Sequence, residues 1–147
     1  MNPGTSYAIG QLMGGLGGVF IGSLVASLIL RFLLSTFFQI ITPFTEVFKV
    51  VFCVTFINYV IGFAIGYGLA MFLTPTNTQI IGGIISTIIG LVISGFAYGL
   101  FIRDSSGTPI GVARGFLLSF AYILFVLIVC GGFAAAVFGI LAFAGAL

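Results

Sequence analysis

Four long apolar stretches, separated by shorter polar segments, make up most of this chain. They cover about residues 8–30, 50–73, 80–102 and 115–138, and the last remains apolar to the end of the sequence. A helix needs about 20 residues to cross the hydrocarbon core of a membrane. Runs such as Ile84–Ile85 and Ile88–Ile89 lack the alternation of a transmembrane strand. The pattern therefore predicts an all-α integral membrane protein with four transmembrane helices in a single domain, residues 1–147.

The segment between the first two apolar stretches allows two interpretations. From Arg31 to Lys49, apolar residues alternate with Ser, Thr and Gln at roughly helical spacing. One interpretation is a helix over residues 32–45 that lies in the membrane interface. The other is that the first helix continues past the membrane and stops near Pro43.

Composition supports a membrane protein and excludes several classes of soluble protein. Charged residues are 4% of the chain and hydrophobic residues 61%, whereas a soluble domain has about 25% charged residues. Six charges cannot cover a soluble surface, so lipid or partner subunits must cover it. The net charge of +2 and the absence of basic runs argue against a nucleic-acid partner.

The basic residues predict the orientation of the chain in the membrane. Arg31, Lys49, Arg103 and Arg114 all bound or occupy the first and third connections, which four spans place on the same side. The positive-inside rule assigns that side to the cytoplasm. We therefore expect a protein of a bacterial inner (plasma) membrane with its N- and C-termini outside.

Small residues recur every fourth position within the spans and predict glycine-zipper packing. In lipid, where no hydrophobic force drives helices together, small residues allow the close backbone contact that does. We expect this contact in the first span above all, with the second span as its partner. The predicted helix-packing residues are Gly10, Gly14, Gly18, Gly22 and Ala26 in the first span, Asn58, Gly62 and Gly66 in the second, and Gly82, Ser86 and Gly90 in the third.

Asn58 is the most polar residue deep inside a span. Its amide needs a hydrogen-bond partner and will not face lipid. It can bond to a neighbouring helix, or it can line a pore or a ligand site; the sequence leaves both interpretations open.

The residue types needed for chemistry are missing from the spans. The chain has no His, and its two carboxylates, Glu46 and Asp104, lie at the ends of spans. A nucleophile therefore has no base beside it. Cys53 and Cys130 cannot by themselves form a structural zinc site. We expect no enzyme activity, no metal site and no cofactor, and no cofactor-binding residue is identified.

Two hypotheses for function remain. The first is a non-catalytic membrane subunit that packs within a larger membrane protein complex, with other subunits, copies of itself and lipid as its partners. The second is a small oligomeric channel or transporter whose path is lined by Asn58 and the Ser and Thr residues of the third span.

Overall fold

Four long helices make up the fold, described here by a computed structural model. It describes the backbone of residues 3–145 and, within the helices, the side chains of all but residues 3–13, 75, 139 and 141–144. The helices are α1 (Pro3–Phe37), α2 (Phe44–Ala70), α3 (Pro75–Phe101) and α4 (Val112–Gly145). Each contains a stretch long and apolar enough to span a membrane: Gly14–Phe37, Phe44–Ala70, Thr76–Phe101 and Val112–Phe138. This confirms the all-helical fold with four candidate spans.

The end of α1 decides between the two interpretations of the first connection. Residues 32–37 continue α1, residues 38–43 are not helical, and α2 begins at Phe44. Gln39 has a left-handed φ of 54°, and the Ile40 N–H donates to the Leu34 carbonyl at 3.1 Å. This turn reverses the chain, and Pro43 then disfavours helix in the residue before it. A separate helix over residues 32–45 does not form.

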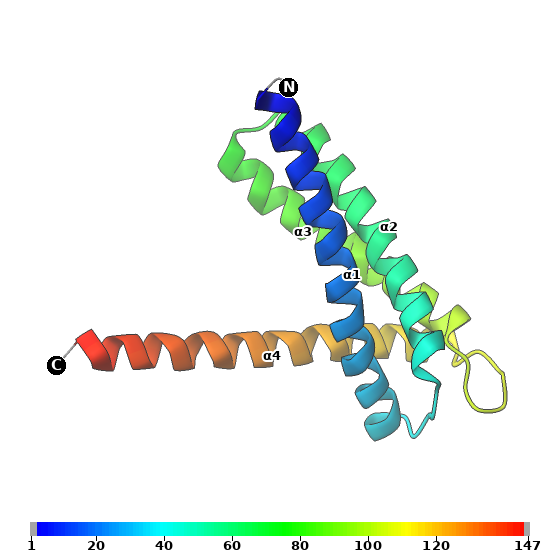
Figure 1. Ribbon diagram of the computed structural model, residues 1–147. Coiled ribbons are helices and arrows are strands. Elements are labelled where there is room, and N and C mark those ends of the chain that lie inside the picture. Colours follow the sequence, from blue (N-terminus) through cyan, green and yellow to red (C-terminus); the bar gives the residue numbers. More distant parts are fainter. Residues whose placement is uncertain (1–2, 146–147) are drawn as a thin grey trace.

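Three helices form a bundle, and the fourth projects from it. Figure 1 shows α1, α2 and α3 running side by side, while α4 crosses them at one end and then leaves at a steep angle. α3 packs against both α2 and α4, and α1 packs against α2 and more lightly against α4. Within the described residues, no close backbone contact joins α1 to α3 or α2 to α4. Each helix therefore packs against two others, and the contact between α1 and α4 is the smallest of the four.

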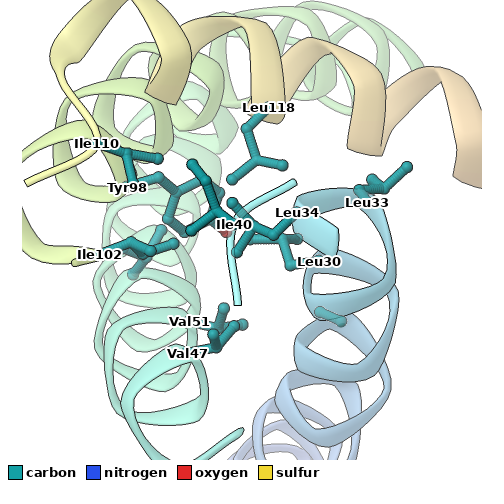
Figure 2. Packing of buried hydrophobic residues seen from close by; sticks show 12 residues of the cluster. Leu30, Leu33, Leu34, Ile40, Val47, Val51, Tyr98, Ile102, Ile110 and Leu118 are labelled. Atoms are coloured by element: carbon teal, nitrogen blue, oxygen red, sulfur yellow. The ribbon is translucent and has the colours of Figure 1, made fainter. Parts of the chain in front are cut away.

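A buried apolar cluster joins all four helices at the end of the bundle where α4 crosses (Figure 2). Leu30 and Leu34 of α1 meet Val51 of α2 and Leu118 of α4 there, and all four are fully buried. The first connection adds Ile40 to this cluster. Other members labelled in Figure 2 are Leu33, Val47, Tyr98, Ile102 and Ile110.

Glycines allow α3 and α4 to cross in backbone contact. A Cβ added at Gly99 would lie 2.6 Å from the Val112 Cα, and one at Gly95 would lie 2.6 Å from the Phe116 ring. A Cβ at Gly115 would overlap the backbone of both Gly95 and Gly99. Only residues without a Cβ let the helices come this close, so these three positions fix the crossing point.

The connection between α3 and α4 is an ordered polar loop built around Asp104. Its carboxylate accepts hydrogen bonds from the backbone N–H groups of Ser106 (2.9 Å) and Thr108 (3.1 Å) and from the Thr108 hydroxyl. Hydrogen bonding from Ser106, first of all, holds the pKa of the Asp104 carboxyl below its ordinary value of 3.8. The buried Thr42 hydroxyl ties the first connection to this loop by donating to the Arg103 carbonyl at 3.1 Å.

We expect Gly115→Ala to destabilise the protein, whereas Gly132→Ala on the same helix will not. The new methyl group at position 115 must separate α3 from α4, at a cost of about 1–3 kcal/mol. A Cβ at Gly132 meets nothing within 4 Å, and Ala there raises helix propensity by about 1 kcal/mol. Reversible unfolding in detergent micelles, followed by circular dichroism, measures both. Equal stability of the two variants would show that the crossing does not depend on Gly115.

The Asp104 loop should lose its order as the pH falls. A carboxylate whose pKa is lowered in the folded state stabilises that state above its ordinary pKa, and this contribution is lost as the pH drops through the lowered value. The Ser106 and Thr108 amide resonances should therefore stay constant from neutral pH to about 4 and change below it. NMR spectra of the protein in micelles test this. Asp104→Ala should abolish the transition and show the low-pH pattern at all pH values.

Candidate functional site

A cavity with a few polar groups in a mostly apolar wall lies among the four helices, next to the buried cluster. Its volume is about 300 Å³, and every helix contributes to its wall. Along α3 it extends from Thr87 to Tyr98, which is about 16 Å of helix. It is lined by Ala26 of α1, by Val54, Thr55 and Asn58 of α2, by Thr87, Gly90, Leu91, Ser94 and Tyr98 of α3, and by Ser119, Tyr122 and Ile123 of α4.

Hydrogen-bonding side chains from three helices face each other around this space. The Ser94 hydroxyl donates to the Gly90 carbonyl at 2.6 Å, and the Thr87 hydroxyl donates to the Gly83 carbonyl at 2.8 Å. Both oxygens keep lone pairs with which they can accept a further hydrogen bond. Asn58 lies against Gly90, where an added Cβ would be 3.6 Å from the Asn58 Nδ2. The Asn58 amide therefore packs against α3 at Gly90.

Two buried polar atoms of the cavity wall have no hydrogen-bond partner among the described residues. They are the Oδ1 of Asn58 on α2 and the Oγ of Ser119 on α4. Ser119 is 1% exposed. A buried polar atom without a partner costs about 1–3 kcal/mol. The cavity is therefore a place where a hydrogen-bonding molecule would stabilise the protein.

The cavity continues into a more open groove between α1 and α3. The groove lies where these two helices make no close backbone contact. Gly15, Gly18 and Val19 line it on α1, and Ser86 lines it on α3. It shares Thr55, Asn58, Thr87 and Gly90 with the cavity. Asn58 therefore stands where the groove meets the cavity.

At the end of the bundle where α4 crosses, the cavity closes on the buried apolar cluster. Tyr98 belongs to both the cavity wall and the cluster. One helical turn beyond the wall residues Ala26 and Tyr98 lie Leu30 and Ile102, which are 0% and 1% exposed. This arrangement gives a cavity that opens at the groove and has an apolar floor.

The structure places the predicted glycine row of α1 away from the other helices. A Cβ added at Gly14, Gly18 or Gly22 would meet nothing within 4 Å, so the second span does not cover these three glycines. The face of α1 that packs begins at Gly15, which lies against the Tyr59 side chain. It continues through Val19, Ser23, Ser27 and Leu30, all buried. Ala26 is 7% exposed, and the surroundings of Gly10 lie outside the described side chains.

Of the predicted residues on α2 and α3, several lie where these two helices meet. A Cβ at Gly62 would be 3.8 Å from the Ser86 Oγ, and one at Gly82 would be 3.5 Å from the Leu69 side chain. Gly66 has nothing within 4 Å. The four basic residues Arg31, Lys49, Arg103 and Arg114 lie near or just beyond the helix ends that meet at the buried cluster.

The sequence did not identify the contributions of α4 to the site. Ser119, Tyr122 and the crossing glycine Gly115 lie in an apolar run, and they face inward only because α4 crosses α3 at this point. One signal was available: Gly95 and Gly99 are four residues apart on α3, and Gly111 and Gly115 are four apart around the start of α4. Such pairs favour close helix contact. Cys53 and Cys130 are both free and exposed on the helix surface.

The chemistry open to this site is hydrogen bonding. The titratable groups of its wall are the phenols of Tyr98 and Tyr122, and the remaining polar groups are one amide and four hydroxyls, those of Thr55, Thr87, Ser94 and Ser119. Such a set can bind and orient a polar molecule. It offers no carboxylate or imidazole to take a proton.

Comparisons of this chain with protein-family models, with curated proteins and with solved structures find no match.

Proposed function

We propose that this protein is a non-catalytic integral membrane subunit that packs within a larger membrane assembly, with other subunits or further copies of itself. The observation that carries the proposal is the position of α4. Its described residues from Leu127 to Phe138 are all exposed, and Figure 1 shows this half standing clear of the other helices.

The exposed half of α4 has the composition of a contact surface. It carries Gly131, Gly132 and the run Ala134–Ala136 beside large side chains such as Phe133 and Phe138. Small residues facing lipid gain nothing over larger apolar ones, whereas against another helix they permit close approach. A partner helix could therefore pack closely against the small residues of α4, whereas lipid gains nothing from them.

The uncovered row of α1 supports the same role. Gly14 and Gly22 are exposed and touch no other helix, yet each glycine lowers helix propensity by about 1 kcal/mol relative to Ala. A contact with a second chain would offset this cost. We further propose that the end of the bundle near the four basic residues faces the cytoplasm of a bacterial cell and that both termini lie outside.

Replacing a glycine of the uncovered row should disrupt assembly without unfolding the chain. We expect Gly22→Leu to move the protein from a large complex to the monomer position on a native gel of mildly solubilised membranes, because Leu blocks close approach. Gly18→Leu should act in the same way, although Gly18 also borders the groove. Phe20→Leu is the control: Phe20 is half exposed and its ring contacts Phe48 and Phe52 of α2, so a Leu there keeps an apolar contact within the chain and should leave the complex intact.

Helical content measured by circular dichroism should be the same in all three variants. A wild-type protein that migrates as a monomer, or equal migration of all three variants with the wild type, would contradict the subunit role.

The cavity around Asn58 favours a second candidate function, a small oligomeric channel or transporter. Asn58 of α2 and the α3 residues Thr87 and Ser94 line one continuous space, as a solute path requires. The apolar floor beneath Tyr98 must then open during transport. A change in the packing of α1 or α4 against the buried cluster would supply this movement.

Liposome flux tests the second candidate. If it is correct, vesicles containing the purified protein should equilibrate a small polar solute faster than empty vesicles, and Asn58→Leu should reduce this excess rate by about tenfold through loss of the polar contact. Gly66→Leu, on the same helix at a position without neighbours, should leave flux unchanged. Absence of flux for urea, glycerol and monovalent ions would exclude this function.

A further inference from the structure

We propose that the cavity around Asn58 and Ser119 binds one small uncharged molecule that both donates and accepts hydrogen bonds, of the class represented by urea and other small amides. The proposal goes beyond the subunit role. It also names the solute class for the second candidate function, but does not depend on it, because binding can be measured without transport.

The hydrogen-bonding groups of the cavity fit a molecule that carries both donors and acceptors. The unpartnered Asn58 Oδ1 requires a donor. The Ser119 hydroxyl, also without a partner, can donate to a carbonyl. An amide supplies its N–H to the first and its C=O to the second. Asn58 on α2 and Ser119 on α4 both line this cavity, so one molecule bound there lies between the two helices.

The wall of the cavity carries no charged side chain, which selects against ions. Lining residues supply hydroxyls, one carboxamide and apolar side chains, with no carboxylate, Lys or Arg. A bare ion moved into such a site loses its hydration without gaining a counter-charge, at a cost that exceeds that of a neutral polar molecule by far. Urea and guanidinium have the same planar shape and differ in charge, so they form a matched pair of probes.

The size and shape of the cavity suit a compact solute. A volume of about 300 Å³ is about ten times the roughly 30 Å³ that a water molecule takes in the liquid. The apolar floor closes one end, and the groove beside Thr55 and Asn58 leads in from the other. A molecule of a few heavy atoms can therefore enter through the groove and stop beneath it, where the unpartnered atoms lie.

Protection of an introduced thiol tests the proposal. In a Cys53→Ala/Cys130→Ala background, Ser94→Cys places a thiol in the cavity wall, and Ser106→Cys places one on the exposed loop as the matched control. The protein in lipid vesicles is labelled with methyl methanethiosulfonate, a small uncharged reagent. We expect urea to slow labelling of Ser94→Cys about threefold once its concentration is about twice its dissociation constant, and to leave Ser106→Cys unaffected.

Guanidinium at the same concentrations should give no protection, and adding Asn58→Leu should abolish protection by urea. Equal protection by both probes, or by neither, would overturn the proposal. So would the absence of labelling in a folded Ser94→Cys protein. If that variant does not fold, Thr55→Cys, which lies in the same wall, is read by the same criteria. Protection without liposome flux would leave the binding site established and exclude only the transport function.

Discussion

The arrangement of this protein depends on the contact at one end of the molecule, where all four helices meet. There the apolar cluster around Leu30, Leu34, Val51 and Leu118 is fully buried, and the glycines of α3 and α4 bring two backbones into contact. In lipid this contact gains little from the hydrophobic effect, so close dispersion contacts must hold the helices together. Because α4 contacts the other helices only at this end, its remaining length projects from the bundle.

The cavity is a consequence of the same contact. α4 crosses α3 at Gly95 and Gly99, which brings Ser119 and Tyr122 opposite Asn58 and the α3 hydroxyls. α1 has close backbone contact with α2 but not with α3, and a groove lies between α1 and α3 beside Asn58. The polar groups inside the bundle are thus held by α2 and α3, which pack along their length, and by α4, which joins them at one end only. A bound solute or an adjoining chain would reach these groups through the groove.

The two proposed roles use different surfaces and are compatible. Assembly would use the exposed half of α4 and the outward glycines of α1, which lie on the outer surface of the molecule. Solute binding would use the interior around Asn58 and Ser119. A subunit that covered the groove next to Gly18 would also control access to the cavity. In that case the oligomeric state and the affinity for the solute would be linked.

The sequence by itself determined the four apolar helices, because span length and hydropathy are local properties. It also indicated Asn58 as a residue that must face the interior, since an amide in lipid needs a partner. It did not determine which face of α1 packs: the glycine row and the face that begins at Gly15 are neighbours on one helix, and both contain small residues. That choice, the crossing at Gly115 and the inward position of Ser119 were decided by contacts between residues far apart in the chain. Small residues in lipid permit a close contact without specifying the partner helix, so only the tertiary structure could select it.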